Sequence, residues 1–306
     1  MKNVLFATTA LIATAGMAAA EITIGGSGRF GLAYNEGAAI DGTEVNSTRV
    51  EQRMRVNITG IATTDAGVKF EGRIRLEANE NADNSIGGRG PGAVGFAVSY
   101  EGLRVDVGNV SDVFDSGDVV DLYGYGVGLT SFIEQVSNSA GLTNNGFGAN
   151  ESEDYTTLKA RYTTNGFTVA ASYSHNEVFD TGTATQADIT NMQIGAGYNF
   201  GNYTVGAAFG SSDDAGTSND YWAASFGGDI GQVAFSLLLT DSDVADDMTV
   251  GGSINYALSS ATDLRAVFSD GGAAGSDTAY GVGFRHSLGG GVSLRGGVGS
   301  NDSGNT

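Results

Sequence analysis

The chain consists largely of short segments in which apolar and polar side chains alternate. The pattern is clearest in residues 22–34, 48–59 and 67–77, where Arg and Lys fall on one parity and Ile, Val, Leu, Phe and Met on the other. Successive side chains of a strand point to opposite faces, so each segment predicts a strand with one apolar and one charged face. Thirteen of the fifteen Lys and Arg residues, all except Lys2 and Arg89, lie on the polar parity of such segments.

Fifteen segments of this kind are joined alternately by short and long connections. They cover residues 22–34, 48–59, 67–77, 94–100, 103–107, 157–163, 167–173, 191–200, 203–209, 220–226, 233–239, 248–257, 262–269, 278–288 and 292–298. Links such as Glu101-Gly102 predict hairpins between antiparallel neighbours, whereas 174–190 and 210–219 are long and polar. Short turns at one end and long loops at the other are typical of a transmembrane barrel. The sequence therefore predicts an all-β, antiparallel transmembrane β-barrel with its charges turned inward.

The number of segments is odd. Bacterial single-chain barrels have an even number of strands, so fifteen segments leave the sheet one strand short. After Val298 the chain is polar up to Thr306 and contains no further alternating segment. We therefore expect sixteen strands, of which the last, about ten residues long, is missing from this chain.

The first twenty residues have the three parts of a secretory signal. Lys2 precedes an apolar run from Val4 to Met17, and small residues follow up to Ala20. The run is too short and too rich in Ala and Thr to favour a membrane anchor. We expect residues 1–20 to be a signal peptide and residues 21–306 to form one exported barrel domain.

Composition excludes several classes of protein. The chain has no Cys, a single Pro and a net charge of −20. These values exclude a disulfide framework, agree with a large uninterrupted sheet, and argue against a nucleic-acid partner, which requires a basic surface. With only two His, a His/Cys metal or transfer site has almost no ligands. A G-x-G-x-x-G match at Gly26–Gly31 lies inside a predicted strand with no helix after it, so it predicts no dinucleotide site.

Aromatic residues recur near the ends of the predicted strands on the apolar parity. They are Tyr34, Tyr100, Tyr162, Phe167, Tyr173, Tyr198, Phe200, Tyr203, Phe209, Phe226, Tyr256, Phe268 and Tyr280. Strand propensity explains part of this pattern. Their bias toward strand ends favours girdles at the two surfaces of a bilayer.

One connection, from about residue 108 to 156, differs from the others. It contains many carboxylates and no Lys or Arg. It is longer than a plain loop in a compact domain, and its apolar side chains argue against disorder, so we expect it to pack on another part of the protein. Its first acids recur every third position, which fits either one face of a short helix or simply an acidic composition. The acids with this spacing are Asp112, Asp115, Asp118 and Asp121, and Glu134, Glu151, Glu153 and Asp154 follow them.

Three stretches resemble a known family. They are the start of the exported domain at Glu21–Ile24, the run Arg29–Asn35 and the hairpin sequence Tyr198–Gly206. They are similar to the general porins of alphaproteobacteria, particularly of the Rhodobacter type. The resemblance implies a homotrimer of sixteen-stranded barrels in the Gram-negative outer membrane, in contact with lipid and lipopolysaccharide. It also implies that the third long loop folds inward and places carboxylates opposite a basic wall.

Both sides of such a constriction can be assigned in this chain. The basic wall maps onto Arg29, Arg53, Arg55, Arg73 and Arg75, and the acidic side onto Asp112, Asp115, Asp118, Asp121 and Glu134. Crowded cations repel one another in a narrow lumen, so a nearby anionic loop offsets a real cost. Alternatively, the arginines form an ordinary solvated face and pair with the intervening glutamates. We expect general lumen lining from Arg49, Lys69, Arg104, Lys159, Arg161, Arg265, Arg285 and Arg295.

These features predict a general diffusion porin for ions and small hydrophilic solutes. Transport would be passive, so the protein would be no enzyme and would need no cofactor. A substrate-specific channel and a secreted β-rich structural or adhesive protein remain as alternatives. The loop carboxylates also leave open a structural Ca²⁺ site, although no stretch has EF-hand spacing.

Overall fold

The computed structural model describes residues 21–36, 39–40, 43–44, 46–80, 86–148, 155–180, 185–214, 216–301 and 303. The predicted signal peptide, residues 1–20, lies outside the described residues. Within those ranges the regular structure consists of strands only. None of the described residues belongs to a helix that is long and apolar enough to cross a membrane.

The strands form one large antiparallel sheet in chain order. Its members are β1 (Glu21–Tyr34), β4 (Thr48–Thr63), β5 (Lys69–Glu80), β6 (Ile86–Pro91), β7 (Gly95–Tyr100), β8 (Leu103–Gly108), β9 (Thr156–Thr164), β10 (Phe167–Asp180), β11 (Thr185–Phe200), β12 (Tyr203–Asp214), β13 (Thr217–Ile230), β14 (Val233–Ser242), β15 (Asp247–Ala257), β16 (Thr262–Gly272), β17 (Ala279–Gly289) and β18 (Val292–Ser300). A separate small hairpin joins β2 (Ala39–Ile40) to β3 (Thr43–Glu44). Because β6 and β7 both pair with β5, one beyond the other, the sheet has fifteen strand positions, and each corresponds to a predicted segment.

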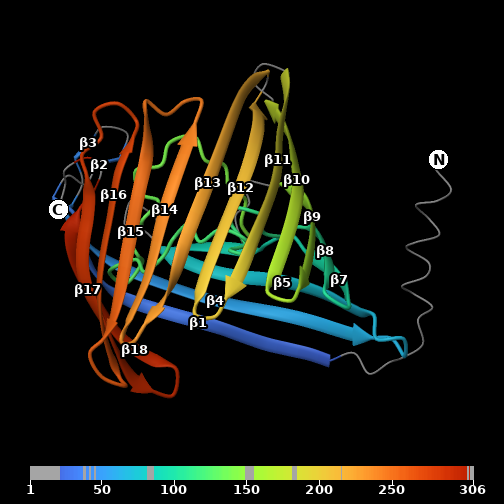
Figure 1. Ribbon diagram of the computed structural model, residues 1–306, viewed down its shortest axis with the longest axis horizontal. Helices are drawn as coiled ribbons and strands as arrows, with labels where there is room; N and C mark the ends of the chain where they lie inside the picture. Colours follow the sequence, from blue (N-terminus) through green and yellow to red (C-terminus); the bar gives the residue numbers. More distant parts are fainter. Residues whose placement is uncertain are drawn as a thin grey trace.

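The sheet curves but does not close. Among the described residues β1 pairs only with β4, and β18 only with β17, so the two strands are free edges (Figure 1). The expected sixteenth strand has no counterpart in the described part of the chain. The all-β antiparallel barrel architecture is otherwise the predicted one.

Several strands are longer than the alternation indicated. β10 and β11 pair as far as Asp180 and Thr185, and β12 and β13 as far as Asp214 and Thr217. The stretches 174–190 and 210–219 were predicted as long loops, and most of their residues instead belong to these strands. The sequence of these extensions does not alternate regularly between apolar and polar residues, so the pattern did not indicate them as strands.

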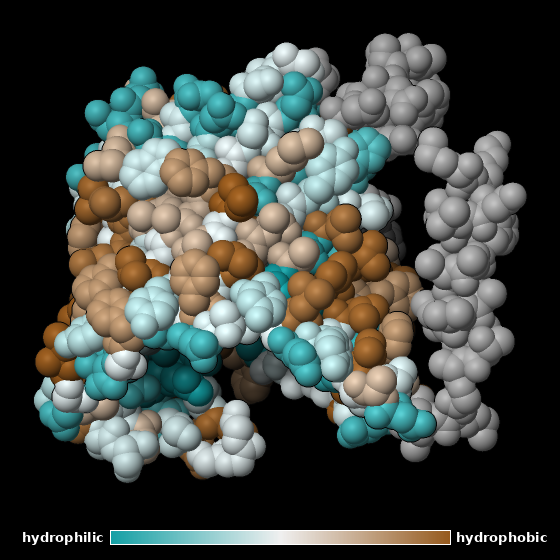
Figure 2. All heavy atoms as spheres, turned by 45° about the vertical axis from the view of Figure 1, so that its right-hand side comes forward, coloured by the Kyte–Doolittle hydropathy of each residue, from teal (hydrophilic) through white to brown (hydrophobic). Residues whose placement is uncertain are grey.

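The outer and inner faces of the sheet have opposite character. Phe30 and Leu32 on the outer face of β1 are 86% and 78% exposed. Figure 2 shows apolar side chains spread over the outer surface, with hydrophilic ones along its upper edge. On the inner face, polar side chains such as Ser172, Gln193 and Ser236 are buried. The sheet is thus apolar outside and polar inside, as a lipid-facing sheet requires.

Outward aromatic rings form a continuous row near the short turns. Tyr198 and Phe200 stack at 5.9 Å between centroids, and Phe200 lies 5.8 Å from Tyr203. Tyr203 stacks on Phe226 at 5.9 Å, and Phe226 meets Phe235 edge to face at 5.6 Å. The row occupies one end of strands β11 to β14, where a girdle at a membrane surface is expected.

The long connection after β8 lies within the curve of the sheet (Figure 1). We call residues 109–148 of this connection the inward segment. Its apolar side chains form the main core of the protein together with inner-wall residues of β10 and β12 to β14. A second, smaller core joins Val127 and Ile133, which face each other in a β-bridge, to Val267 and Ala279. The expected packing partner of this segment is therefore the inner wall of the barrel.

Candidate functional site

Serine side chains of the wall hold the backbone of the inward segment. The N–H of Val113 donates to Ser172 Oγ on β10 at 3.2 Å. Three further N–H groups donate at 2.9 Å to serines on later strands, and buried backbone donors need such partners. These pairs are Asp121 with Ser225, Tyr125 with Ser253, and Asn138 with Ser269. The segment is thereby fixed along β10 to β16.

Lumen-facing glycines give the segment room to approach the wall. A Cβ at Gly206 would overlap the carbonyl oxygen of Val119, and one at Gly251 would overlap that of Gln135. Glycine at these positions therefore permits close backbone contact. On β17 and β18, a Cβ at Gly297 would meet the backbone of Gly128, and one at Gly281, Gly283 or Gly299 would meet the side chain of Val127 or Ile133. We call these lumen-facing glycines the seat of the inward segment. Sequence analysis missed the seat, although glycines on the parity of a strand that carries the charged side chains were an available signal.

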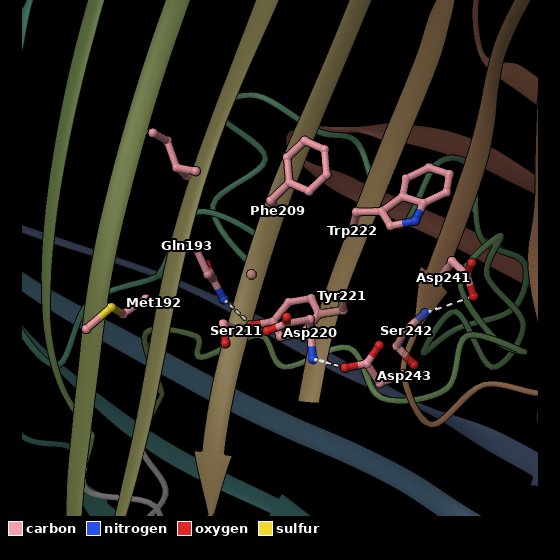
Figure 3. A pocket seen from close by; sticks show the side chains of 12 residues that line it. Met192, Gln193, Phe209, Ser211, Asp220, Tyr221, Trp222, Asp241, Ser242 and Asp243 are labelled. Carbon is pink, nitrogen blue, oxygen red and sulfur yellow. Dashed lines mark hydrogen bonds between the residues drawn. The ribbon is translucent and has the colours of Figure 1, made fainter. Parts of the chain in front are cut away.

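Asp112 anchors the first turn of the segment. Its side chain is fully buried and accepts hydrogen bonds from the N–H groups of Asp115 (2.8 Å) and Asn145 (2.7 Å) and from Gln193 Nε2 (2.9 Å). Figure 3 shows Gln193 directed at Tyr221, which belongs to the same network. Burial raises the pKa of Asp112 to about 6, against the opposing effect of these hydrogen bonds. Asp112 was predicted at the pore surface, and the structure places it in the protein interior.

Asp118 binds two cations of the adjacent wall. Its carboxylate accepts from Lys159 Nζ at 2.8 Å and from Arg161. Burial alone would raise the pKa of Asp118, but these two partners hold it below its usual value. Lys159 and Arg161 were predicted as general lumen lining, and the structure shows that they tie β9 to the inward segment.

Asp121 and Glu134 lie further along the segment. Asp121 accepts from Ser236 Oγ at 2.6 Å and from the N–H of Gly124 at 3.0 Å. Glu134 makes no ion pair within the described residues. Burial, and then the charge of Asp121, raises the pKa of Glu134 to about 7. The four aspartates and Glu134 therefore have separate environments, and the residues around them form turns and bends rather than the helix considered as one alternative.

Asp115 is the predicted acid that meets the predicted basic wall. It lines a cavity together with Arg55, Arg73, Arg75 and Phe147. The arginines come from β4 and β5, and Asp115 and Phe147 come from the inward segment. Opposite charges thus face one cavity from two different elements of the fold.

Phe147 is a part of this site that sequence analysis missed. Its ring lies 3.9 Å from the Arg73 guanidinium carbon and 4.6 Å from that of Arg75. Arg75 also donates to the Phe147 carbonyl oxygen at 2.6 Å and to Asn57 Oδ1 at 2.9 Å. Cation–π contacts of this kind fix guanidinium orientation. A single large ring in a stretch otherwise rich in Gly and Asn was the only sequence signal.

Other cations of this wall are paired with acids, which was the alternative considered for it. The pairs are Arg49 with Glu51 at 3.0 Å, Lys69 with Glu71 at 3.6 Å, Arg104 with Glu71 at 3.1 Å and with Asp106 at 2.8 Å, and Arg55 with Glu77. Arg53, Arg73 and Arg75 make no ion pair with any described residue. Arg29 lies directly opposite Arg53 in the ladder between β1 and β4. The wall thus contains cations that are paired with acids and cations that are not, and of the latter Arg73 and Arg75 contact the inward segment.

The remaining predicted lumen cations are on the last three strands. Arg265 on β16 donates to Asn255 Oδ1 at 3.0 Å and to the carbonyl oxygen of Gly126 at 3.2 Å. Arg285 on β17 and Arg295 on β18 are directly opposite each other. The structure therefore separates the lumen arginines into two groups on different parts of the wall.

A family model described as Gram-negative porin matches residues 7–306 of the chain. The chain belongs to this family. The porin is 30% identical over 284 residues to a porin of Fuscovulum blasticum, covering 91% of this chain and 94% of that protein. It is 26% identical over 320 residues to a porin of Rhodobacter capsulatus, covering 92% and 95%. A solved triple mutant of Rhodopseudomonas blastica porin superposes with a TM-score of 0.75 at 28% identity, covering 94% of this chain and 96% of that one.

Family membership confirms the resemblance inferred from the sequence. The porin is a protein of the Gram-negative outer membrane and forms a general diffusion channel there. The alternative of a secreted structural or adhesive protein is excluded. Within the described ranges, no group of three or more His, Cys, Asp or Glu side chains is placed to hold a metal ion. The Ca²⁺ site considered from the sequence stays a prediction.

Proposed function

We propose that solutes are selected at an eyelet between the inward segment and the wall of β4 and β5. Asp115 and Phe147 form one side of the eyelet, and Arg53, Arg73 and Arg75 form the other. The observation that carries this proposal is the cavity that Asp115 and Phe147 share with Arg73 and Arg75. The lumen would be narrowest there because the inward segment occupies the space across from the arginines.

Charge separation across the eyelet would sort solutes by polarity. Cations pass nearer Asp115 and anions nearer the arginines, while dipolar molecules align with the field between them. An apolar solute gains nothing from this field and loses contact with water. Passage requires no bond to form or break, so the channel works by diffusion and not as an enzyme.

We further infer that three copies of the porin assemble side by side in the membrane. The family and the continuous apolar outer surface of the sheet support this proposal. Folded protein in detergent should run as a trimer on a gel without heating and as a monomer after boiling. A monomer in both samples, with barrel structure verified by circular dichroism, would contradict it.

Ion selectivity tests the eyelet directly. Replacing Arg53, Arg73 and Arg75 together by Gln removes three cations of β4 and β5 that make no ion pair with a described residue, and leaves Arg55 bound to Glu77. In a tenfold KCl gradient across a planar bilayer, the reversal potential should move toward the ~59 mV limit of an ideal cation channel. Asp115→Asn should move it in the opposite direction, and Gly60→Ala, whose Cβ would meet no atom within 4 Å, should leave it unchanged. Equal reversal potentials for all four proteins would place the eyelet elsewhere.

A further inference from the structure

The second arginine group is not part of the eyelet. Arg265, Arg285 and Arg295 lie on three neighbouring strands and face the lumen on the same parity as the glycines beneath the inward segment. None of the three makes an ion pair among the described residues. Asp263 is opposite Arg285 on its other side but does not form an ion pair with it, so the group keeps a positive excess.

Placing Arg285 opposite Arg295 is unfavourable by itself. Like charges directly across an antiparallel ladder repel each other, and here Arg265 lies within electrostatic range of both. At two other lumen arginines, Arg55 and Arg104, neighbouring acids of the chain offset the charge. An anion that is not part of the chain would relieve it here.

Residues of β15 and of the inward segment surround part of this arginine group. The carbonyl oxygen of Gly126 and the Asn255 side chain hold the Arg265 guanidinium, and the Tyr125 ring centroid is 5.9 Å from it. Gly283 and Gly297 are the next lumen positions away from the short turns, and a Cβ at either would meet Val127 or Gly128 of the inward segment. The inward segment therefore lies beside the group on the long-loop side, where Arg295 lines a cavity together with Leu129 and Phe132 of that segment.

One further charged pair faces the group. Arg295 lines a cavity that also contains Arg49 and Glu51. Glu51 is bound to Arg49 at 3.0 Å and is therefore not available to neutralise Arg295. An entering anion would find guanidinium donors on β17 and β18 with no competing carboxylate in contact.

We propose that Arg265, Arg285 and Arg295 form a binding site for a small, doubly charged oxyanion of the phosphate type. A guanidinium offers two parallel N–H donors that match two oxygens of a tetrahedral oxyanion, and two adjacent guanidiniums can bind opposite edges of it. A monovalent spherical ion such as chloride cannot use this geometry. The site rests on the proposed function in one respect, because the eyelet and the open lumen would bring solutes to it.

Phosphate binding can be measured without a conducting channel. Folded protein in detergent, in 0.1 M NaCl to screen diffuse attraction, is titrated with inorganic phosphate in a calorimeter. Arg285→Gln with Arg295→Gln should weaken phosphate binding about tenfold or more, because charge-assisted hydrogen bonds are lost. Removing two mutually repelling charges should not impair folding, which circular dichroism checks. Lys69→Gln, which removes a cation already paired with Glu71, should change the affinity less than about twofold.

Two further variants make the test sharper. Arg285→Lys with Arg295→Lys keeps the charge but loses the two-pronged donors, so its phosphate affinity should fall several-fold. Arg73→Gln with Arg75→Gln should leave phosphate binding in place while it alters ion selectivity. Equal affinity in the wild type and in the double variant Arg285→Gln with Arg295→Gln would overturn the site, as would full retention of affinity by the lysine pair. Failure of the eyelet would show in reversal potentials alone, so the two proposals can fail separately.

Discussion

Among the acids of the inward segment, Glu134 has an ionisation that matters near neutral pH. It has no counter-ion among the described residues, and burial followed by the charge of Asp121 raises its pKa to about 7. The pKa of an exposed Glu is about 4.3, so the packed segment favours the neutral form. This contribution to stability is complete below about pH 4.3 and is lost as the pH rises through 7.

The lumen should therefore change with pH. Raising the pH from 5 to 8 charges Glu134, so the porin should become more cation-selective and its inward segment less tightly held. Glu134→Gln should remove most of this change, leaving a smaller part from Asp112, whose pKa is about 6. Reversal potentials at both pH values measure the effect, with Asp65→Asn in an exposed turn as the control. A wild-type pH dependence that survives Glu134→Gln intact would assign it to another group.

Phe147 should limit the motion of the Arg73 and Arg75 guanidinium groups as well as narrow the pore. Phe147→Leu removes cation–π contacts worth about 0.5–2 kcal/mol and leaves Arg73 and Arg75 less fixed. Open-channel current noise should rise, and the reversal potential should shift only slightly. Phe132→Leu, at a position 46% exposed on the same segment, is the matched control. Identical noise in both variants would mean that the ring does not hold the guanidiniums.

At the scale of elements, the inward segment behaves as a docked part of the wall rather than a free loop. Its backbone contacts glycines and donates to serines on strand after strand from β10 to β16. We therefore expect small residues on the inner face to influence pore size, because they determine how closely the inward segment approaches the wall. A single added methyl group at the seat should displace the segment without disturbing the hydrogen-bond ladder of the sheet.

Gly206→Ala tests this docking. The added Cβ would overlap the carbonyl oxygen of Val119, so the inward segment must move away from β12 and single-channel conductance should change clearly, upward if the segment leaves the lumen axis. Gly25→Ala, on a strand where the Cβ meets nothing within 4 Å, should conduct as the wild type does. Conductance that is unchanged in Gly206→Ala would show that the seat does not set pore size.

The sequence predicts the strands of this protein better than it predicts the contacts of the inward segment. Strands were recognisable because alternation is local. Their extensions to Asp180 and Asp214 were missed because the sequence there does not alternate regularly. The acids of the inward segment looked alike in sequence. Asp118 differs from Asp112 only through Lys159, Arg161 and other partners on distant strands, and spacing along the chain contains no information about such contacts.

At the scale of the whole molecule, the tip of the inward segment connects the two free edges of the sheet. Leu129 contacts the position of Gly31 on β1, and Gly128 contacts that of Gly297 on β18. β1 and β18 do not pair with each other among the described residues, but the tip of the inward segment lies against both of them.

A disulfide can test this arrangement, because the chain has no Cys of its own. Gly31→Cys with Leu129→Cys should cross-link under mild oxidation, since an ideal Cβ at residue 31 is 3.8 Å from Leu129 Cγ. A gel without reductant shows the cross-linked form by its altered mobility. Gly25→Cys with Leu129→Cys should stay reduced, and cross-linking of both pairs to the same extent would mean that the tip is not held at β1.

The wall serines that hold the inward segment all come later in the chain. Those that bind Val113, Asp121 and Asn138 lie 59, 104 and 131 residues further on. The segment is therefore synthesised before its seat exists, and contacts of such long range form late because loop closure must come first. An assembling barrel would pass through a wide, unselective stage, and its permeability would be restricted only in the last step of folding.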